Sequence, residues 1–503
     1  MRPVGAIVLA AGLGTRMNST LAKVLHHLGG RPLITYPLAA LRGAGIDPIV
    51  VVVGYQAEAV RAACAPYGVR FALQSEQRGT GDATRVAHRA LRDFAGDLLL
   101  VYGDLPFLRP QSFRKLIAAH QAAGATVSLL TETLPDPTGF GRIVRDVHGR
   151  VERIVEDRDA NDVQRAIREV NVGVYCADAG FLFRALEQLR PNNVQGELYL
   201  TDVIELALRH GARVAAAAAT AGEGAQISTR ADLAERGKTL RDEINQRWMA
   251  AGVTLEDPAT TYIGPDVVIG RDTIMGPNVI LRGATRIGEG CRFDGSALIT
   301  DTVLGNHVHV KFGVVMTQAT LDDHVEVGPF AQLRAGTRLA AQVHIGDFVE
   351  TKNAVIGART KAMHHAYLGD TDIGEDANIG AGTITCNYDG IRKQHTHIGD
   401  RVQVGSDSQL VAPVSVGADA YIATATTVRT DVPPGALVFT EKHQAHREGW
   451  VAQWRARAQG SAPAPPRRAR QTAAGRPKKV APRKRRGQLP RTGTARRKTK
   501  TVR

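Results

Sequence analysis

Cysteine, long apolar runs and, near the C-terminus, acidic residues are all scarce in this 503-residue sequence. No apolar stretch approaches the roughly 20 residues that a membrane-spanning helix needs. The N-terminus lacks the apolar segment and the small-residue cleavage site of a signal peptide. The cysteines are widely separated, with no CxxC pair and no disulfide-framework spacing, which favours a reducing compartment; they are Cys64, Cys176, Cys291 and Cys386. We therefore expect a soluble, cytoplasmic protein.

Acidic residues are absent from residues 461–503, which hold 16 of the 64 lysines and arginines. In the rest of the chain 48 basic residues face 49 acidic ones, so the net charge of +15 belongs to this tail. From residue 455 onward the segment has too little aliphatic content to fold alone, and we expect it to be disordered. Its charge would suit a tether to polyanions such as nucleic acid, ribosomes or anionic membranes. The plainer interpretation is a solvated extension without a specific partner.

The first part of the chain, to about Arg230, alternates short apolar runs with segments of helical spacing. This alternation predicts an α/β fold with a doubly wound, mainly parallel sheet, whose ligands lie at the carboxyl ends of the strands. The expected strands are residues 4–9, 48–53, 98–102, 126–130 and 170–175, and helical spacing is found at 31–43 and 83–94. Residues 231–250, free of proline, predict one long linking helix.

After the linking helix, an aliphatic residue followed by glycine recurs from Ile263-Gly264 to Val416-Gly417, often at spacings of six residues or a multiple of six. A six-residue period is typical of a parallel β-helix. One aliphatic side chain per short strand fills the core of a triangular coil, and small residues form its corners. The period breaks near residues 305–323 and 387–397, where we expect extruded loops, which often carry functional sites.

A glycine loop, LAAGLGTRM, follows the first expected strand directly. Its glycines let backbone N–H groups approach phosphate oxygens, and Arg16 and Lys23 add two cations for a triphosphate and its pyrophosphate leaving group. Asp104 ends an otherwise apolar strand, where a carboxylate suits Mg²⁺ bound together with substrate phosphates. Each feature also has a plainer interpretation. The loop could be an ordinary strand-to-helix turn, and Asp104 could cap the turn before Pro106.

Together these motifs resemble a known family. LAAGLGTRM, the Lys23 segment, QRGTG, YGD, PTGFGRI, the Glu156 and Asn171 segments and NNVQGELYLTD follow one another in the order found in the bacterial bifunctional N-acetylglucosamine-1-phosphate uridylyltransferases / glucosamine-1-phosphate N-acetyltransferases. With the repeats, the resemblance extends to about Trp450. It implies acetyl-CoA-dependent N-acetylation of glucosamine 1-phosphate, followed by transfer of UMP from UTP to N-acetylglucosamine 1-phosphate with Mg²⁺. UDP-N-acetylglucosamine is a precursor for peptidoglycan and lipopolysaccharide.

For uridylyl transfer, the resemblance makes Arg16 and Lys23 catalytic and Asp104 a Mg²⁺ ligand. Ser228 stands where the family has an asparagine as second metal ligand, and a hydroxyl can ligate Mg²⁺ directly or through water. The residues implied to bind UTP or UDP-N-acetylglucosamine are Leu9, Ala10, Ala11, Gly12, Lys23, Gln74, Gly79, Thr80, Tyr102, Gly103, Asp104, Gly141, Glu156, Asn171 and Ser228.

For acetyl transfer, the resemblance makes His364, in the sequence KAMHHAYLGD, the general base. Acylating an amine requires a base, and histidine titrates in a suitable range, although a lone histidine is more often a surface residue. The implied ligands of glucosamine 1-phosphate are Arg334, Lys352, Tyr367 and Asn378, and those of acetyl-CoA are Ala381, Asn387, Tyr388, Ser406, Thr424 and Glu441. Thr424 and Glu441 depart from the family pattern, so contacts with the nucleotide part of the coenzyme are expected to be weaker or rearranged.

The expected organisation is a Rossmann-like uridylyltransferase domain (1–230), a helical linker (231–251), a left-handed β-helix acetyltransferase domain (252–454) and a disordered basic tail (455–503). The resemblance also implies a homotrimer with acetyltransferase sites between subunits. Two rival interpretations remain. Another sugar-1-phosphate nucleotidyltransferase, making ADP-glucose or GDP-mannose, would use the coil only for assembly. A nucleic-acid binder driven by the tail would use a retired enzyme scaffold.

Overall fold

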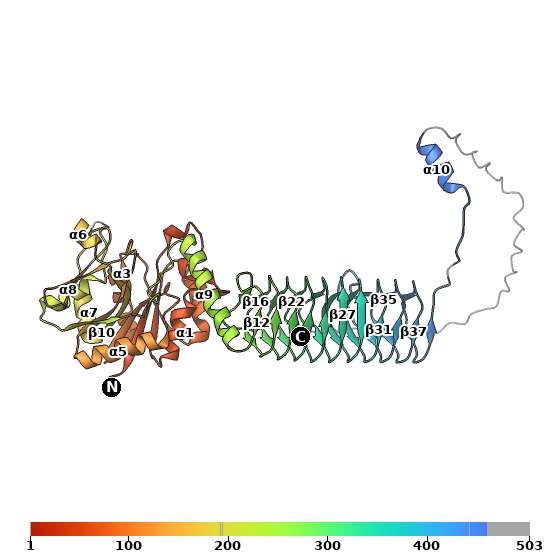
Figure 1. The fold of residues 1–503 in the computed structure, drawn as a ribbon, viewed down its shortest axis with the longest axis horizontal. Coiled ribbons are helices and arrows are strands. Elements are labelled where there is room, and N and C mark those ends of the chain that lie inside the picture. Colours follow the sequence, from red (N-terminus) through yellow and green to blue (C-terminus); the bar gives the residue numbers. More distant parts are fainter. Residues whose placement is uncertain (1, 192, 194, 442, 460–503) are drawn as a thin grey trace, which may run out of the picture. The chain divides into compact units, whose positions relative to one another are not determined.

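The computed structural model describes the chain except for residues 1, 192, 194, 442 and 460–503. It divides into two units, Met1–Thr440 and Glu441–Arg503. The first unit contains a twisted sheet with helices on both faces and a long coil of parallel strands (Figure 1). In the part of the chain that is described, no helix is both long and apolar enough to cross a membrane.

The N-terminal sheet has nine strands, in the order β11-β7-β10-β6-β1-β4-β5, with β8 and β9 attached beside β10. The strands are β1 (Val4–Ala10), β4 (Ile49–Val53), β5 (Arg70–Leu73), β6 (Asp97–Tyr102), β7 (Val127–Thr133), β8 (Arg142–Arg145), β9 (Val151–Val155), β10 (Glu169–Asp178) and β11 (Val214–Ala218). All five expected strands are present. β10 runs antiparallel to β6 and β7, so the sheet is mixed rather than wholly parallel. Apolar runs report burial on both faces, not strand direction.

Helices cover both faces of this sheet and give it two hydrophobic cores. One core involves α1 (Thr35–Gly43), α2 (Ala57–Cys64) and α5 (Pro110–Ala123); the other involves α3 (Thr80–Val86), α4 (His88–Leu91), α7 (Ala179–Gln188) and α8 (Asp202–Arg209). The helix expected at 31–43 begins only at Thr35. Before it, β3 (Arg31–Pro32) pairs with β2 (His27–Leu28), because Gly29 and Gly30 adopt positive φ angles and turn the chain.

The predicted linking helix is confirmed as α9 (Arg230–Ala250). It begins with a capping box, in which the side chains of Thr229 and Asp232 each accept a backbone N–H from the other's residue. Near its C-terminal end, the buried Asn245 amide donates hydrogen bonds to the carbonyls of Pro258 and Thr261, at 2.9 and 3.0 Å. These bonds fasten the helix to the start of the coil.

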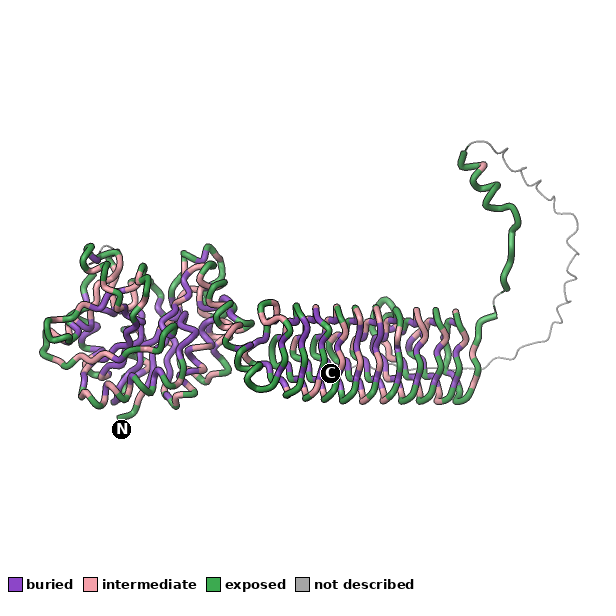
Figure 2. Tube along the Cα trace, in the orientation of Figure 1, coloured by how far each residue is buried: buried purple, intermediate pink, exposed green. Residues whose placement is uncertain are grey.

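The coil is a left-handed parallel β-helix of short strands from β12 (Thr254–Leu255) to β39 (Leu437–Val438), arranged in an 11-stranded and a 17-stranded sheet. The predicted aliphatic positions point inward: Ile263, Ile269 and Ile287 are at most 5% exposed. Figure 2 shows a continuous buried interior along the stacked turns. Glycine follows these residues because successive turns approach closely. A Cβ on Gly270 would lie 2.5 Å from the backbone of Gly288.

No loop leaves the coil at residues 305–323, so that prediction is wrong. The segment contains β21 (His309–Val310), β22 (Val315–Thr317) and β23 (Thr320–Leu321), all in parallel register with the turns on either side. Ile280 pairs with Leu298, and Leu298 pairs with Val315, so one turn is simply a residue shorter than the other. The shorter turn broke the six-residue spacing without extruding any chain.

The second predicted loop is confirmed: residues 387–395 leave the coil between β32 (Ile384–Cys386) and β33 (Thr396–Ile398). The other strands near the predicted acetyl site are β27 (His344–Asp347), β28 (Glu350–Ile356), β29 (Lys361–His364), β30 (Tyr367–Ile373), β31 (Asn378–Ile379), β34 (Gln403–Val404), β36 (Val414–Val416) and β37 (Tyr421–Ile422).

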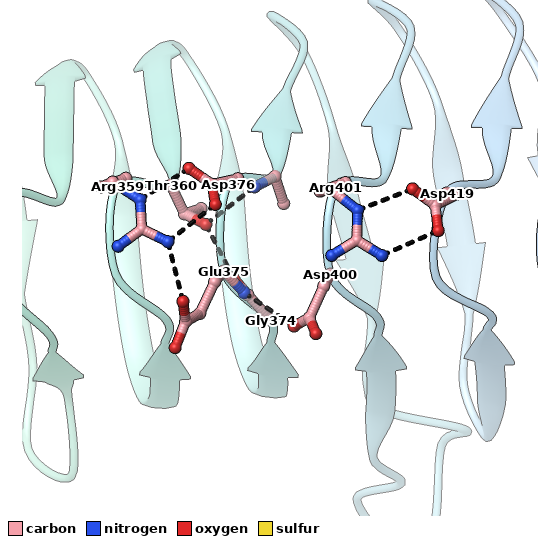
Figure 3. A network of polar contacts seen from close by, with 9 residues as sticks. Arg359, Thr360, Gly374, Glu375, Asp376, Asp400, Arg401 and Asp419 are labelled. Atoms are coloured by element: carbon pink, nitrogen blue, oxygen red, sulfur yellow. Dashed lines mark hydrogen bonds and ion pairs between the residues drawn. The ribbon is translucent and has the colours of Figure 1, made fainter.

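Ion pairs connect successive turns at one corner of the coil (Figure 3). Arg359 binds the carboxylates of Glu375 and Asp376, each at 2.8 Å or less, and Arg401 binds Asp419 at 2.7 and 2.8 Å. All five side chains are partly exposed, so these pairs add little stability individually. Each pair joins equivalent corners of neighbouring turns and so helps to keep the turns aligned.

The second unit contains α10 (Trp450–Ala458), in which the rings of Trp450 and Trp454 stack with centroids 6.2 Å apart. Disorder from residue 455 onward was therefore wrong for Arg455 to Ala458, which complete this helix. A helix is cooperative, so residues next to a formed turn extend it at little cost. Residues 460–503, with nearly all of the basic tail, lie outside the described residues.

Candidate active sites

The first candidate site lies where β1 and β6 end side by side. Leu9 pairs with Tyr102, and the Gly103 N–H donates to the Leu9 carbonyl at 3.0 Å. After β1 the chain enters the glycine loop, where Gly14 has a φ of 67° and its Cβ position would lie 2.5 Å from the Lys23 Cβ. Only glycine allows both this left-handed conformation and this close approach. The loop therefore brings Lys23 to the end of β6.

At the end of β6, the Lys23 ammonium forms an ion pair with the Asp104 carboxylate, which is 3% exposed. The carbonyl of Asp104 accepts a hydrogen bond from the Ile227 N–H at 3.2 Å, which places Ser228 next to this point. Ser228 is 7% exposed, and its N–H donates to Asp232 at 2.9 Å. The Asp104 carboxylate is an oxygen ligand that fits Mg²⁺ shared with phosphate oxygens, and the backbone segment that carries Ser228 runs beside it.

Beside the glycine loop, a hollow of about 460 Å³ is lined by Gly54, Tyr55, Leu73, Gln74, Ser75 and Gln77. The Gln74 amide is fixed by hydrogen bonds to Gly79 and Asp82, at 3.2 and 3.0 Å. Gly79 has a φ of 106° and lies against the Leu198 backbone, so only glycine fits there. The neighbouring Thr80 hydroxyl accepts the Leu200 N–H at 3.0 Å. The predicted base-reading residues thus form a rigid, amide-rich wall.

The predicted sugar-binding residues lie deeper, around Glu156. Burial raises the pKa of the Glu156 carboxyl, although the Thr201 hydroxyl, which donates to it at 3.3 Å, opposes this shift. Gly141 leaves space beside this carboxyl, since its Cβ position would lie 3.4 Å from Oε2. The Asn171 amide donates to the Tyr175 hydroxyl at 2.6 Å. This region offers buried amide and hydroxyl groups and a half-buried carboxyl, which suit the reading of a polyhydroxylated ring.

Arg16 is the one predicted cation of this site that extends into solvent, without an ion-pair partner among the described residues. The other predicted residues lie at the ends of β1 and β6, between β5 and α3, beside β8, β9 and β10, and in the loop before α9; they are Leu9, Ala10, Ala11, Gly12, Lys23, Gln74, Gly79, Thr80, Tyr102, Gly103, Asp104, Gly141, Glu156, Asn171 and Ser228. Among them Tyr102 has a pKa raised by burial, so its hydroxyl stays protonated and can donate.

The second candidate site follows one corner of the coil. The residues that occupy this corner in successive turns are His364, Ala381, Ser406 and Thr424. Backbone hydrogen bonds join the turns there, from the Gly382 N–H to the His365 carbonyl, from Asp407 to Ala381 and from Ala425 to Ser406. His364 Nδ1 lies 2.7 Å from Asp347 Oδ1, the acid one turn earlier. Because Asp347 is the acceptor, Nδ1 carries the proton, and Nε2 is left with a free lone pair.

Along the adjoining face lie the predicted phosphate-binding cations and the loop 387–395. Arg334 donates to Glu350 at 2.7 Å, and Lys352 pairs in register with Gly369. The Asn387 amide donates to the buried Asp370 and lies 3.4 Å from the Tyr367 hydroxyl. Asn378, in β31, and Tyr388, in the loop, are both exposed. Glu441 lies outside the unit Met1–Thr440 that holds the other predicted residues.

Sequence reasoning missed three residues of this site. Asp347, which orients His364, lies one coil turn before it, and the length of the repeat could have revealed that pairing. Asp370 bonds to Asn353 as well as to Asn387, and Lys393 Nζ lies 3.8 Å from its Oδ2. Lys393 lies beside Lys352, and this second ammonium lowers the pKa of Lys352. The loop thus adds a third cation beside Arg334 and Lys352.

This chain is similar to a known domain family and to several known proteins along most of its length. Residues 6–171 match the family model for a MobA-like NTP transferase domain. The bifunctional protein GlmU of Pelobacter propionicus is 49% identical over 452 residues, covering 90% of this chain and 98% of that protein. The proteins of the same name from Trichlorobacter lovleyi and Anaeromyxobacter sp. are 49% and 48% identical, covering 88% and 92% of this chain and 97% and 96% of theirs.

Proposed function

Since the chain belongs to the family of bifunctional GlmU proteins, we propose which residues perform its two reactions and how. It is a bifunctional transferase of UDP-N-acetylglucosamine synthesis. In the coil, glucosamine 1-phosphate is N-acetylated with acetyl-CoA; in the N-terminal fold, UMP passes from UTP to N-acetylglucosamine 1-phosphate, and pyrophosphate leaves. A different nucleotidyltransferase with a purely structural coil is not favoured.

For acetyl transfer, His364 acts as the general base. Its Nε2 removes a proton from the substrate ammonium, and the free amine attacks the thioester carbonyl of acetyl-CoA. The tetrahedral intermediate then expels the thiolate, which takes up a proton. Asp347 holds the imidazole in the competent tautomer and stabilises its protonated form. The observation that supports this role is the 2.7 Å contact between Asp347 and His364.

The substrates of acetyl transfer would lie on either side of His364. Arg334, Lys352 and Lys393 form a cationic group suited to the phosphate of glucosamine 1-phosphate, with Tyr367 and Asn378 at the sugar. Ala381, Ser406 and Thr424, along the corner, and Asn387 and Tyr388, in the loop, would contact acetyl-CoA; Glu441 is proposed as a ligand from the family resemblance alone.

For uridylyl transfer, the protein needs no covalent nucleophile. A phosphate oxygen of N-acetylglucosamine 1-phosphate attacks the α-phosphorus of UTP in line with the leaving pyrophosphate, while Arg16 and Lys23 neutralise the developing charge. The glycine loop holds the triphosphate, Gln74, Gly79 and Thr80 read the uracil, and the Glu156 region holds the sugar. The ion pair between Lys23 and Asp104 places the cation at the strand end where the phosphates would lie.

Mg²⁺ would be held by Asp104 together with substrate phosphates, with Ser228 as a direct or water-mediated partner. When bound, it neutralises phosphate charge and orients the phosphoryl oxygens. Lys23 is a second positive charge on the same carboxylate, so the ion pair keeps the buried Asp104 compensated before substrate arrives. The side chain of Ser228 is shorter than that of the asparagine found in the family, so its oxygen reaches less far toward the metal. We expect the Mg²⁺ affinity to depend on this difference.

We also propose the domain boundaries expected from the sequence: 1–230, 231–251, 252–454 and 455–503. The working form would be a cytoplasmic homotrimer, supported by the family relationship. The basic tail could add electrostatic attachment to polyanions without taking part in either reaction.

The direct test is to incubate the purified chain with glucosamine 1-phosphate, acetyl-CoA, UTP and Mg²⁺ and to follow CoA, pyrophosphate and UDP-N-acetylglucosamine. Both partial reactions and the coupled product are expected. Failure of both partial reactions would refute the function, and acetylation failing alone would support the nucleotidyltransferase with a structural coil.

A further inference from the structure

At the end of the loop 387–395, two histidines and one aspartate converge on a single point. His397 of β33 pairs in register with Asp372 of β30, on the neighbouring turn. In β33, Thr396 and Ile398 point into the core, so residues 395 and 397 both face outward, toward Asp372. One ligand atom from each side chain lies within 4.8 Å of the other two.

The distances from each histidine to the aspartate match those between two ligands of one metal ion. Nε2 of His395 is 3.1 Å and Nδ1 of His397 is 3.5 Å from the same oxygen, Oδ2 of Asp372. Two ligands at about 2.0–2.1 Å from a tetrahedral ion are about 3.3 Å apart. The ring centroids of the two histidines are 4.6 Å apart and tilted by 52°, so the rings converge without stacking.

The polar contacts of the cluster are also incomplete. Nε2 of His395 is buried and, among the described residues, makes no hydrogen bond; its contact with Asp372 lacks hydrogen-bond geometry. A buried ring nitrogen without a partner normally carries a free-energy penalty. An ion between the nitrogen and the carboxylate would remove that penalty, because each ligand atom would then have a partner.

We propose that Asp372, His395 and His397 form a binding site for a zinc-class divalent cation, separate from the Mg²⁺ site of uridylyl transfer. Two imidazole nitrogens with one carboxylate suit Zn²⁺ and its transition-metal neighbours, whereas Mg²⁺ prefers an all-oxygen set. The three side chains are 37–58% exposed, which leaves room for water at a fourth position.

This ion would clamp the neck of the loop 387–395. The loop closes on itself where the Gln394 N–H donates to the Asn387 carbonyl at 2.8 Å, and His395 is the next residue. A ligand on the loop side of the neck and two on the coil would therefore fasten the loop to β30 and β33. On the function proposed above, the clamp would also hold Asn387 and Lys393 in place at the acetyl site. Metal binding itself does not depend on that function.

The test uses the full chain, stripped of metal and kept in excess Mg²⁺. Calorimetric titration with Zn²⁺ should find a site that is lost in D372N, H395N and H397N. Replacing an outer-sphere partner of a metal typically weakens binding by roughly 10- to 100-fold, and losing a ligand should cost at least as much. H309N is the matched control: its imidazole also contacts a carboxylate, Asp294, at 2.9 Å, but outside the proposed site.

Two further readouts separate a built site from loose surface binding. Co²⁺ should give the intense visible absorption of a low-coordinate site in the wild type and in H309N, but not in the three site variants. Zn²⁺ should slow amide hydrogen exchange in residues 387–397 of the wild type only. Equal Zn²⁺ affinity in the wild type and the site variants would overturn the metal site, and unchanged exchange on saturation would overturn the clamp. Neither result bears on the proposal that the chain catalyses the two transferase reactions.

Discussion

The hydrogen bond between Asp347 and His364 gives a quantitative prediction for acetyl transfer. In Asp347→Asn the amide keeps the size of the carboxylate but loses its charge. Asparagine can present either an amide N–H or an oxygen to Nδ1, so the tautomer with Nε2 unprotonated is no longer enforced. We expect kcat for acetylation to fall while KM for both substrates changes little, because Asp347 acts through His364 and touches neither substrate.

The size of the effect follows from the exposure of the pair. A hydrogen bond to a charged group contributes about 1.5–3 kcal/mol net. The side chains of His364 and Asp347 are 65% and 39% exposed, so water screens the interaction and the lower end applies. About 1.4 kcal/mol corresponds to a roughly tenfold loss in rate.

The assay is a double-mutant cycle with Asp347→Asn, His364→Ala and the double variant, measured by CoA release. Uridylyl transfer, measured by pyrophosphate release, serves as the internal control and should be unchanged in all three. Because the carboxylate acts only through the imidazole, Asp347→Asn should have little further effect once His364 is gone. Fully additive losses, or a rise in KM with kcat unchanged, would refute the reasoning.

Three other predictions concern stability and metal binding. Gly14→Ala should lower the free energy of unfolding by at least the roughly 1–2 kcal/mol that a non-glycine residue loses in the left-handed conformation, and so lower the melting temperature. Gly12→Ala should not, because a Cβ on Gly12 would meet nothing within 4 Å. Equal effects of the two substitutions would contradict the close packing of Gly14 on Lys23. Burial, reinforced by the nearby Glu205, raises the pKa of Asp202 to about 6 from 3.8, so the folded state holds this proton longer and stability is lost as pH rises from about 4 to 6. Asp202→Asn should therefore raise the melting temperature at pH 7.5 but much less at pH 4, and a constant difference would exclude this cause. Ser228→Asn should increase Mg²⁺ affinity in uridylyl transfer, seen as a lower Mg²⁺ concentration at half-maximal rate; an unchanged value would remove Ser228 from the metal site.

The fold was largely predictable because its strongest signals are local. Each aliphatic-glycine pair indicates one buried side chain and one crowded corner in its strand. The structure shows the buried side chain at Ile269 and the crowded corner at Gly270. The direction of β10 was not predictable, because pairing partners far apart in sequence decide it. The prediction of a loop at 305–323 failed because the turn before Val315 is one residue shorter. A missing residue and an inserted loop both interrupt a six-residue period, so the sequence pattern cannot distinguish them.

The site residues that could be predicted are likewise those that belong to local motifs. Gly14, Lys23 and Asp104 stand in recognisable motifs, and the structure brings them together at the ends of β1 and β6. Asp347 has no motif of its own; it gains its contact with His364 only when successive turns stack in register. The cluster of Asp372, His395 and His397 is equally invisible along the chain, because a loop separates its histidines from the turn that carries the aspartate.

The central claim is that one chain holds two separate active sites, and the most direct test measures both partial reactions in His364→Ala and Asp104→Ala. His364→Ala should lose acetylation and keep uridylyl transfer from supplied N-acetylglucosamine 1-phosphate. Asp104→Ala should lose uridylyl transfer and keep acetylation. Loss of both activities in either variant, with the fold intact by circular dichroism and by melting temperature, would contradict the account.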